Sequence, residues 1–245
     1  MKISPDIVAE LAPTGVLRAG LNLSNFLLIS ARDDDGGPVG VAPDMATAIA
    51  ERLGVPVRYV PYPKPGELAD AAGTDAWDIG LIGAEPARAE KIEFTPAYVE
   101  IQSTYLVPAN SPLRTIADVD QPGIRIASTS RTAYGLWLDR NIQHAEIVHS
   151  ENMDATFELF QRDGLDALSG LRPRLMTDLA RLPGARILEG QFAAVQQAIG
   201  TLRENKAGAR FLREFAADAI ASGLVARLIA KHGVEGLSVA PGFIP

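Results

Sequence analysis

The sequence has no cysteine and only three histidines among its 245 residues. Disulfides, thiol nucleophiles and thiolate-bound metals are therefore excluded. Two of the histidines, His144 and His149, lie five positions apart with no third histidine near them, so we expect no metal site. The apolar run 26–29 is far shorter than the roughly 18 residues that a membrane-spanning helix requires. A membrane span is not expected.

Several chemical signatures are also missing. The chain contains no Gly-x-Ser-x-Gly, no phosphate-binding glycine loop and no Gly-x-Gly-x-x-Gly, so no cofactor is expected. The net charge of −7 and the pI near 5.0 argue against nucleic acid as a partner, because phosphate binding requires a basic surface. These absences favour a small molecule as the partner of a chain that we expect to be a monomer.

Apolar, strand-like runs alternate with segments of helical periodicity along the chain. From Pro43 to Leu53, for example, Met45, Ile49 and Leu53 recur every four residues, which is typical of a helix with one buried face. Such alternation favours parallel sheets covered by helices. The pattern is repeated in the second half, where a helix is predicted from Met153 to Arg162. The predicted fold class is therefore α/β with two lobes.

Two β-rich segments are predicted to connect the lobes. The first is 103–107, which ends at a proline-rich stretch, and the second is 192–199, which precedes a polar turn at 200–205. The predicted boundaries are residues 1–107 for the first part of lobe 1, 108–196 for lobe 2, and 197–245 for the return to lobe 1 and the C-terminal helices.

The most specific pattern lies at 77–98, with WDIGLIGAEPAR at 77–88 and IEFTPAY at 92–98. Weaker matches follow the same order along the chain: LRAG at 17–20, GVAPDM at 40–45 and LDAL at 165–168. Together they resemble the type II periplasmic binding proteins, and within them the family 3 solute-binding proteins of amino-acid ABC transporters. The resemblance implies two lobes joined by two crossover strands, with ligand held between them and hinge closure on binding. It also implies a periplasmic location and an ABC permease as partner.

The resemblance places a ligand-binding arginine at Arg88, shortly after the strand that ends at Gly83. The planar guanidinium holds a carboxylate with two parallel hydrogen bonds. In the other lobe it places an anion site at Ser130, Arg131 and Thr132, where hydroxyls and backbone N–H groups begin a helix. Capping of that helix by Ser130 or Thr132 is an alternative that would coexist with binding.

The chain departs from the family where an aspartate usually holds the ligand's ammonium, since Leu171 stands there and Arg172 follows. A buried ammonium without an anionic partner costs several kcal/mol, so acids are favoured as ligands. Glu85 replaces the threonine of the family turn, and it either faces the ligand or caps the short helix expected at 86–91. Arg131 stands where the family usually has glycine. Together with Arg172 it adds positive charge that favours an anionic ligand, and exposure of either arginine on the surface is the alternative.

In lobe 1 the resemblance adds polar contacts from Asn22 and Asn25 and an apolar wall from Phe26 or Leu28. On the return crossover, strand alternation puts Gln196 and Gln197 on opposite faces, so one of them contacts ligand, and Gln196 is the candidate. The spacing of Tyr134 and Trp137 favours a core position over a binding site.

The leading hypothesis is a binding protein without enzymatic activity that captures a small carboxylate or amino acid for transport. An enzyme similar to cyclohexadienyl dehydratase, with Glu85 as general acid, is the first alternative. A sensory ligand-binding module is the second. Residues 1–14 have one lysine and no signal-like apolar stretch, which leaves a cytoplasmic location open for the chain as given.

Overall fold

The computed structural model describes residues 3–241, which form two compact units. Of the described residues, unit 1 comprises 3–100 and 196–241, and unit 2 comprises Ile101–Val195. The chain passes between the units inside two long strands, β7 (Val99–Val107) and β12 (Ala193–Leu202). The first boundary therefore lies within the segment that the sequence assigned to the end of lobe 1.

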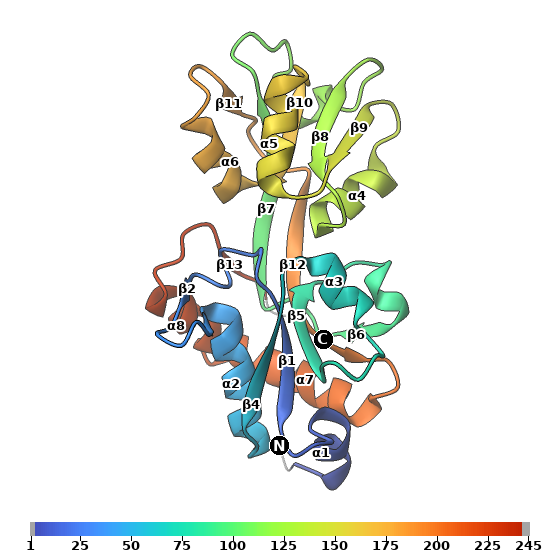
Figure 1. Cartoon of the computed structure of the whole chain (residues 1–245), viewed down its shortest axis with the longest axis vertical. Helices are drawn as coiled ribbons and strands as arrows, with labels where there is room; N and C mark the ends of the chain where they lie inside the picture. Colours follow the sequence, from blue (N-terminus) through green and yellow to red (C-terminus); the bar gives the residue numbers. More distant parts are fainter. Residues whose placement is uncertain (1–2, 242–245) are drawn as a thin grey trace. The chain divides into compact units, whose positions relative to one another are not determined.

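Unit 1 is built on a mixed sheet (Figure 1). Its central strand β1 (Leu17–Asn22) pairs in parallel with β4 (Val57–Tyr62) and with β5 (Ile79–Gly83). The returning strand β12 pairs antiparallel with β5 and with the short strand β6 (Ile92–Phe94). The remaining short strands are β2 (Ala31–Arg32) and β3 (Pro38–Val39), which form a hairpin, and β13 (Ser238–Val239), which pairs with β7.

The α-helices of unit 1 contribute buried apolar side chains to its core. In α2 (Val41–Leu53) the predicted residues Met45, Ile49 and Leu53 are all buried, and Gly54 ends the helix in the left-handed conformation with φ +74°. The other helices are α1 (Pro5–Leu11), α3 (Pro65–Asp70), α7 (Lys206–Ala221), α8 (Leu224–Lys231) and the 3-10 turn η1 (Arg88–Glu90).

Unit 2 repeats the design with fewer elements. Its strands follow the order β7, β10 (Ala167–Leu171), β8 (Arg125–Thr129) and β9 (Glu146–Ser150), and β11 (Arg186–Ile187) pairs with β7. The pairs β8–β9 and β8–β10 are parallel, and β7 is antiparallel to β10. The helices are α4 (Ala133–Asn141), α5 (Met153–Arg162), α6 (Arg172–Leu179) and the 3-10 turn η2 (Ile116–Asp118).

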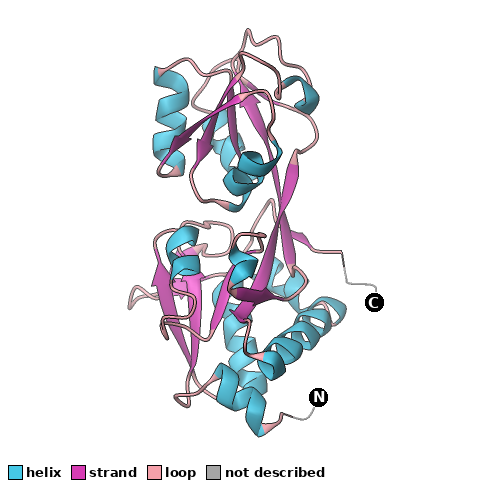
Figure 2. Ribbon diagram, turned by 90° about the vertical axis from the view of Figure 1, so that its right-hand side faces the viewer, coloured by secondary structure: helices cyan, strands magenta, loops and turns pink. Residues whose placement is uncertain are grey.

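Helices flank the strands of both units in the view of Figure 2. In unit 2, Tyr105 and Leu138 belong to one apolar cluster, while Leu106 and Phe157 belong to another. Because Tyr105 and Leu106 are neighbours on β7, their side chains point to opposite faces, so the sheet carries a core on each side.

The α/β fold with two units confirms the predicted fold class, and α5 has the predicted bounds. Two local predictions are wrong. The turn expected at 200–205 begins later, because β12 continues to Leu202 and pairs with β6. The helix expected at 86–91 is only a three-residue 3-10 turn. The sheets are mixed rather than purely parallel, because each crossover strand runs antiparallel to its neighbour.

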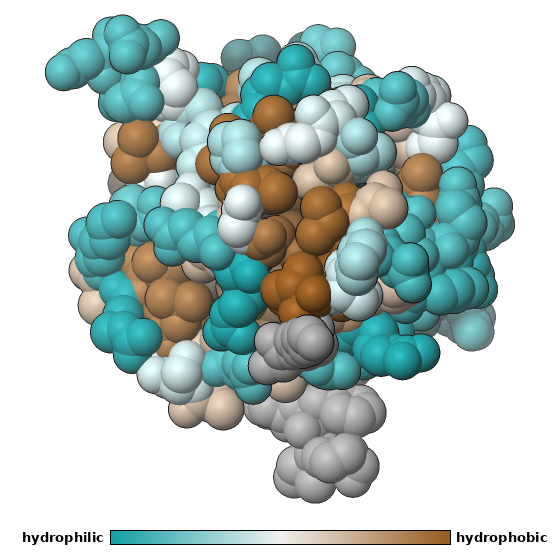
Figure 3. Space-filling view, turned by 90° about the horizontal axis from the view of Figure 1, so that it is seen from below, coloured by the Kyte–Doolittle hydropathy of each residue, from teal (hydrophilic) through white to brown (hydrophobic). Residues whose placement is uncertain are grey.

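No helix within residues 3–241 is long and apolar enough to cross a membrane. The surface drawn in Figure 3 combines hydrophilic side chains with a central apolar area. Scattered apolar atoms are normal on protein surfaces, so this area alone indicates no site.

Candidate ligand-binding site

Arg88 is held in the tight turn that follows β5. It is only 6% exposed, and its Nη1 donates a hydrogen bond of 2.7 Å to the carbonyl oxygen of Gly83. Its backbone N–H bonds to the carbonyl of Glu85 at 3.0 Å. A guanidinium carries five N–H donors in one plane, so it can bind several acceptors at once, and the bond to Gly83 fixes its orientation.

Glu85 is 8% exposed and lies in the same turn. Its carbonyl accepts from the N–H groups of Arg88 and Ala89, so its backbone initiates the turn. The N-cap of the 3-10 turn is Ala87 and no side chain caps it, so the predicted capping role of Glu85 is wrong. The turn therefore contains both a buried carboxyl group and a buried guanidinium.

The end of β1 reaches the same edge of the sheet, because β1 and β5 run parallel with Leu21 opposite Leu81. Asn22 Oδ1 accepts from the N–H and the hydroxyl of Ser24, at 3.2 and 2.8 Å. Buried Asn25 likewise accepts from the N–H groups of Leu27 and Leu28, both at 3.3 Å. Both predicted contact residues thus shape the loop after β1 with their side-chain oxygens.

The two candidates for the apolar wall differ in their exposure to solvent. Leu28 is 2% exposed and belongs to the core of unit 1, whereas Phe26 is 38% exposed. Phe26 is therefore the residue of the pair that can meet a ligand.

The return strand β12 brings both glutamines close to the Arg88 turn. Gln197 is opposite Gly83 in the β12–β5 register and is buried, and the carbonyl of Gln196 accepts from Ala84 N–H at 2.7 Å. Gln196 Nε2 donates to Glu100 Oε1 at 2.8 Å. Sequence reasoning missed Glu100, and only the strand pairing reveals this partner.

In unit 2 the predicted anion site follows the carboxyl end of β8. Thr132 is the N-cap of α4: its Oγ1 accepts from Gly135 N–H at 3.0 Å and donates to the carbonyl of Thr129 at 2.8 Å. Thr132, not Ser130, is therefore the capping residue, since Ser130 N–H bonds to Ser150. Arg131 is exposed and has φ +59°, a left-handed backbone that explains why glycine suits this position.

Leu171 is buried at the end of β10. Arg172 begins α6 and forms hydrogen bonds within unit 2. Its Nε donates to Gln102 Oε1 at 2.9 Å, and its Nη2 donates to the carbonyls of Leu188 and Gly190. These bonds tie β7 to the segment before β12 and give Arg172 a structural function.

The side chains of Asp78 and Arg18 form a pair that the sequence did not predict. This pair explains why the 77–88 motif contains an acidic residue. Asp78 accepts hydrogen bonds from the backbone N, Nε and Nη2 of Arg18 at 2.7, 3.0 and 2.6 Å. Hydrogen bonding to Asp78 raises the pKa of Arg18 and outweighs the opposite effect of burial. The two motifs at 17–20 and 77–88 are therefore joined in space, and the pair anchors β5 to β1.

Among the described residues, the candidate groups of both units follow the carboxyl ends of parallel strands: β1 and β5 in unit 1, and β8 and β10 in unit 2. Ligands of α/β proteins bind at this edge of a sheet. Within residues 3–241 no group of three or more His, Asp or Glu side chains is arranged to hold a metal. Tyr134 is buried, and half-buried Trp137 contacts Phe192 with ring centroids 5.3 Å apart.

The family model described as bacterial extracellular solute-binding proteins, family 3, matches residues 22–235. The cyclohexadienyl dehydratase of Pseudomonas aeruginosa is 28% identical over 176 residues. That alignment covers 66% of this chain and 65% of the dehydratase, slightly less than two thirds of its length.

Solved structures share the fold. A mutant of the ArgBP of T. maritima superposes with a TM-score of 0.72 at 22% identity, covering 94% of this chain and all of the other. A putative binding component of an ABC transporter from Wolinella succinogenes, complexed with lysine, gives a TM-score of 0.72 at 18% identity over 89% of this chain and 95% of the other. Both have the two-lobed periplasmic-binding-protein fold, which is therefore the fold of this chain.

Proposed function

Because the chain belongs to the bacterial extracellular solute-binding proteins, family 3, we propose that it captures a small carboxylate, such as an amino acid, for an ABC transporter. The observation that carries the proposal is the buried guanidinium of Arg88, held by Gly83 at the carboxyl end of β5. A permease partner and a location outside the cytoplasm follow from the family and belong to the same proposal.

The ligand's carboxylate forms two parallel hydrogen bonds with Arg88. Acidic amino acids and amine-free carboxylates bind better than lysine or arginine, because Leu171 offers no charge to an ammonium and a second cation near Arg88 is repelled. The lysine complex of the Wolinella protein belongs to a chain only 18% identical, so it does not fix the ligand here.

A thermal-shift screen of amino acids and small mono- and dicarboxylates tests this function. A ligand at about 100 times its dissociation constant stabilises the native state by roughly 2.7 kcal/mol. Arg88→Ala should make the free energy of ligand binding less favourable by about 2–5 kcal/mol, because the ligand's desolvated carboxylate is left unpaired. Arg58→Ala is the matched control, because Arg58 is an exposed arginine of the same unit on β4. Equal affinity in Arg88→Ala and Arg58→Ala would overturn the site.

Catalysis is the second candidate function. It is favoured by the 28% identity to a cyclohexadienyl dehydratase and by the buried carboxylate of Glu85 three residues before Arg88. In that case Glu85 acts as general acid and protonates the leaving hydroxyl, which departs as water while the ring carboxylate leaves as CO2 and its bonding electron pair enters the ring. We favour binding, because the alignment covers only part of the dehydratase.

Incubation with prephenate separates the two functions. A binding protein returns prephenate unchanged, whereas a dehydratase forms phenylpyruvate. Formation of phenylpyruvate by the wild type but not by Glu85→Gln would assign the chain to the enzymes. Turnover that persists in Glu85→Gln would remove Glu85 from the acid role.

A further inference from the structure

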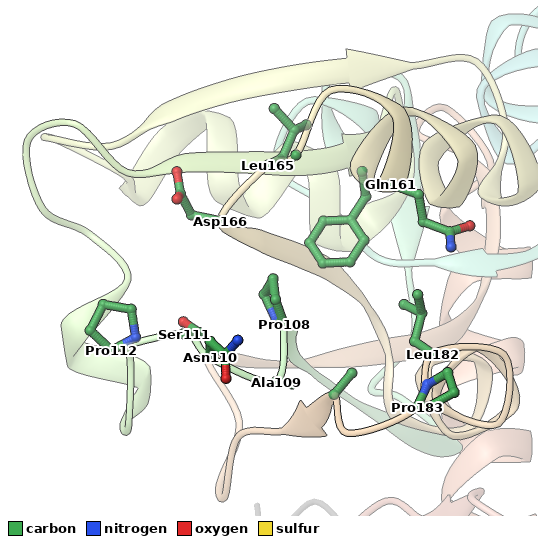
Figure 4. A pocket seen from close by; sticks show the side chains of 13 residues that line it. Pro108, Ala109, Asn110, Ser111, Pro112, Gln161, Leu165, Asp166, Leu182 and Pro183 are labelled. Carbon is green, nitrogen blue, oxygen red and sulfur yellow. The ribbon is translucent and has the colours of Figure 1, made fainter.

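Unit 2 contains a pocket of about 570 Å³ away from the residues discussed above. Three segments enclose it: the loop after β7, the end of α5 with the loop to β10, and the loop between α6 and β11 (Figure 4). Asp166 immediately precedes β10, so the pocket lies at the amino end of that strand. Arg131 and Leu171 follow the opposite, carboxyl edge of the same sheet. This volume is in the range of small-molecule sites.

The lining is mainly apolar, with a few polar groups. The apolar members are Pro108, Ala109, Pro112, Phe160, Leu165, Leu182, Pro183 and Ala185. Figure 4 shows Leu182 and Pro183 on one side of the pocket and Asp166 on the other. A ligand that spans the pocket therefore meets an apolar wall at one end and a carboxylate at the other.

Among the described residues that line the pocket, Asp166 alone carries a charge. Its Oδ2 accepts from the backbone N–H of Arg125 at 2.8 Å, while Oδ1 makes no hydrogen bond to any residue within 3–241. The Arg125 guanidinium binds on the Oδ2 side: Nη2 donates to the carbonyls of Asp163 and Gly164, and Nε forms an ion pair with Asp166 Oδ2 at 4.0 Å. Oδ1 can thus accept from a ligand.

Arg186 is the other basic residue near the pocket, and its side chain binds backbone carbonyls. Arg186 Nη2 donates to the carbonyls of Ser111 and Leu113, the first at 2.8 Å. Arg186 is not among the residues that line the pocket. A ligand in the pocket therefore meets the carboxylate of Asp166 rather than a guanidinium.

We propose that this pocket is a second binding site, which takes a small primary amine with an aromatic or branched aliphatic body. The ammonium donates to Asp166 Oδ1, and the body lies against Leu182 and Pro183. The site is independent of Arg88, so it would stand if the proposed carboxylate site were refuted.

Titration of the full chain with 2-phenylethylamine, followed in amide NMR spectra, tests the proposal, with 2-phenylethanol and phenylacetate as matched neutral and anionic probes. The amine should cause saturable shifts confined to residues 108–112, 160–166 and 182–185. The alcohol should bind about fivefold more weakly, the gain expected for one partly exposed charge pair, and phenylacetate should not bind there.

Asp166→Asn keeps an acceptor for Arg125 N–H but removes the charge, and it should weaken the amine about fivefold. Asp163→Asn is the control, because Asp163 pairs with Arg162 and does not line the pocket. Asn110→Trp, at an exposed lining residue, should block binding sterically, whereas Arg88→Ala should leave it unchanged. Three results would overturn the site: shifts that do not saturate up to about 20 mM of the amine, shifts at residues outside the pocket, or the same affinity for the amine in Asp166→Asn as in the wild type.

Discussion

The two units hold their candidate binding groups by different means. In unit 1 the charged groups are buried and fixed by hydrogen bonds, as Arg88 is by Gly83 and Arg18 is by Asp78. In unit 2 the corresponding groups are a helix cap and an exposed arginine at positive φ. Substitution of the buried Asp78 in unit 1 should therefore affect folding strongly, while substitutions in unit 2 should separate stability from ligand affinity.

The largest expected effect is that of Asp78→Asn, which leaves the buried Arg18 without its main charge partner. Breaking a buried ion pair from one side costs about 3–5 kcal/mol. Chemical denaturation measures the loss.

Asp75→Asn is a control on the same arginine, because Asp75 also bonds to Arg18 Nη2 at 2.7 Å but its side chain is 86% exposed. It should change stability by less than about 1 kcal/mol. Similar losses in the two variants would show that burial does not govern this pair.

The Arg18–Asp78 pair also shows where sequence reasoning ends. The motif identified Asp78, but its partner is 60 positions away and becomes apparent only when β1 and β5 pair. Local periodicity gave the bounds of α5, because helix contacts are close in sequence. The prediction of a turn at 200–205 was wrong at Gly200 and Thr201, because these turn-like residues are buried by pairing with β6. Phe26 and Leu28 could not be distinguished either, since burial depends on the whole fold.

Alkaline pH should destabilise the protein through buried tyrosines. Burial raises the pKa of Tyr98 in unit 1 and of Tyr105 and Tyr134 in unit 2 above the ordinary value of 10.0. Above pH 10 the unfolded chain loses these protons while the native state keeps them, so stability falls as pH rises. The loss approaches about 1.4 kcal/mol per pH unit for each such tyrosine.

Tyr98→Phe should reduce this slope, because it removes a phenol whose oxygen lacks a hydrogen bond within the described chain. Denaturation curves from pH 9 to about pH 11 measure it. An unchanged slope in Tyr98→Phe would assign the alkaline loss to other groups.

Removing the cap of α4 should have a smaller effect. Thr132→Ala deletes the hydroxyl that accepts from Gly135 N–H, which costs about 1 kcal/mol. Because that hydroxyl already donates to Thr129, ligand affinity measured by calorimetry should stay the same. A large loss of affinity with little loss of stability would instead make Thr132 a direct ligand contact.

The smallest effect on stability is expected for Arg131→Gly. Glycine adopts φ +59° without strain, but it also gains entropy in the unfolded chain, so the two contributions nearly cancel, to within about 1 kcal/mol. Affinity for acidic ligands should nevertheless fall, since the substitution removes a cation at the carboxyl edge of β8.

Arg172→Gln provides the contrast: it breaks hydrogen bonds to Gln102 and Leu188, so it should lower stability and leave the preference for acids unchanged. Competition between glutamate and lysine in both variants measures that preference. The reverse pattern, with the preference lost only in Arg172→Gln, would make Arg172 the cation that the ligand meets in unit 2.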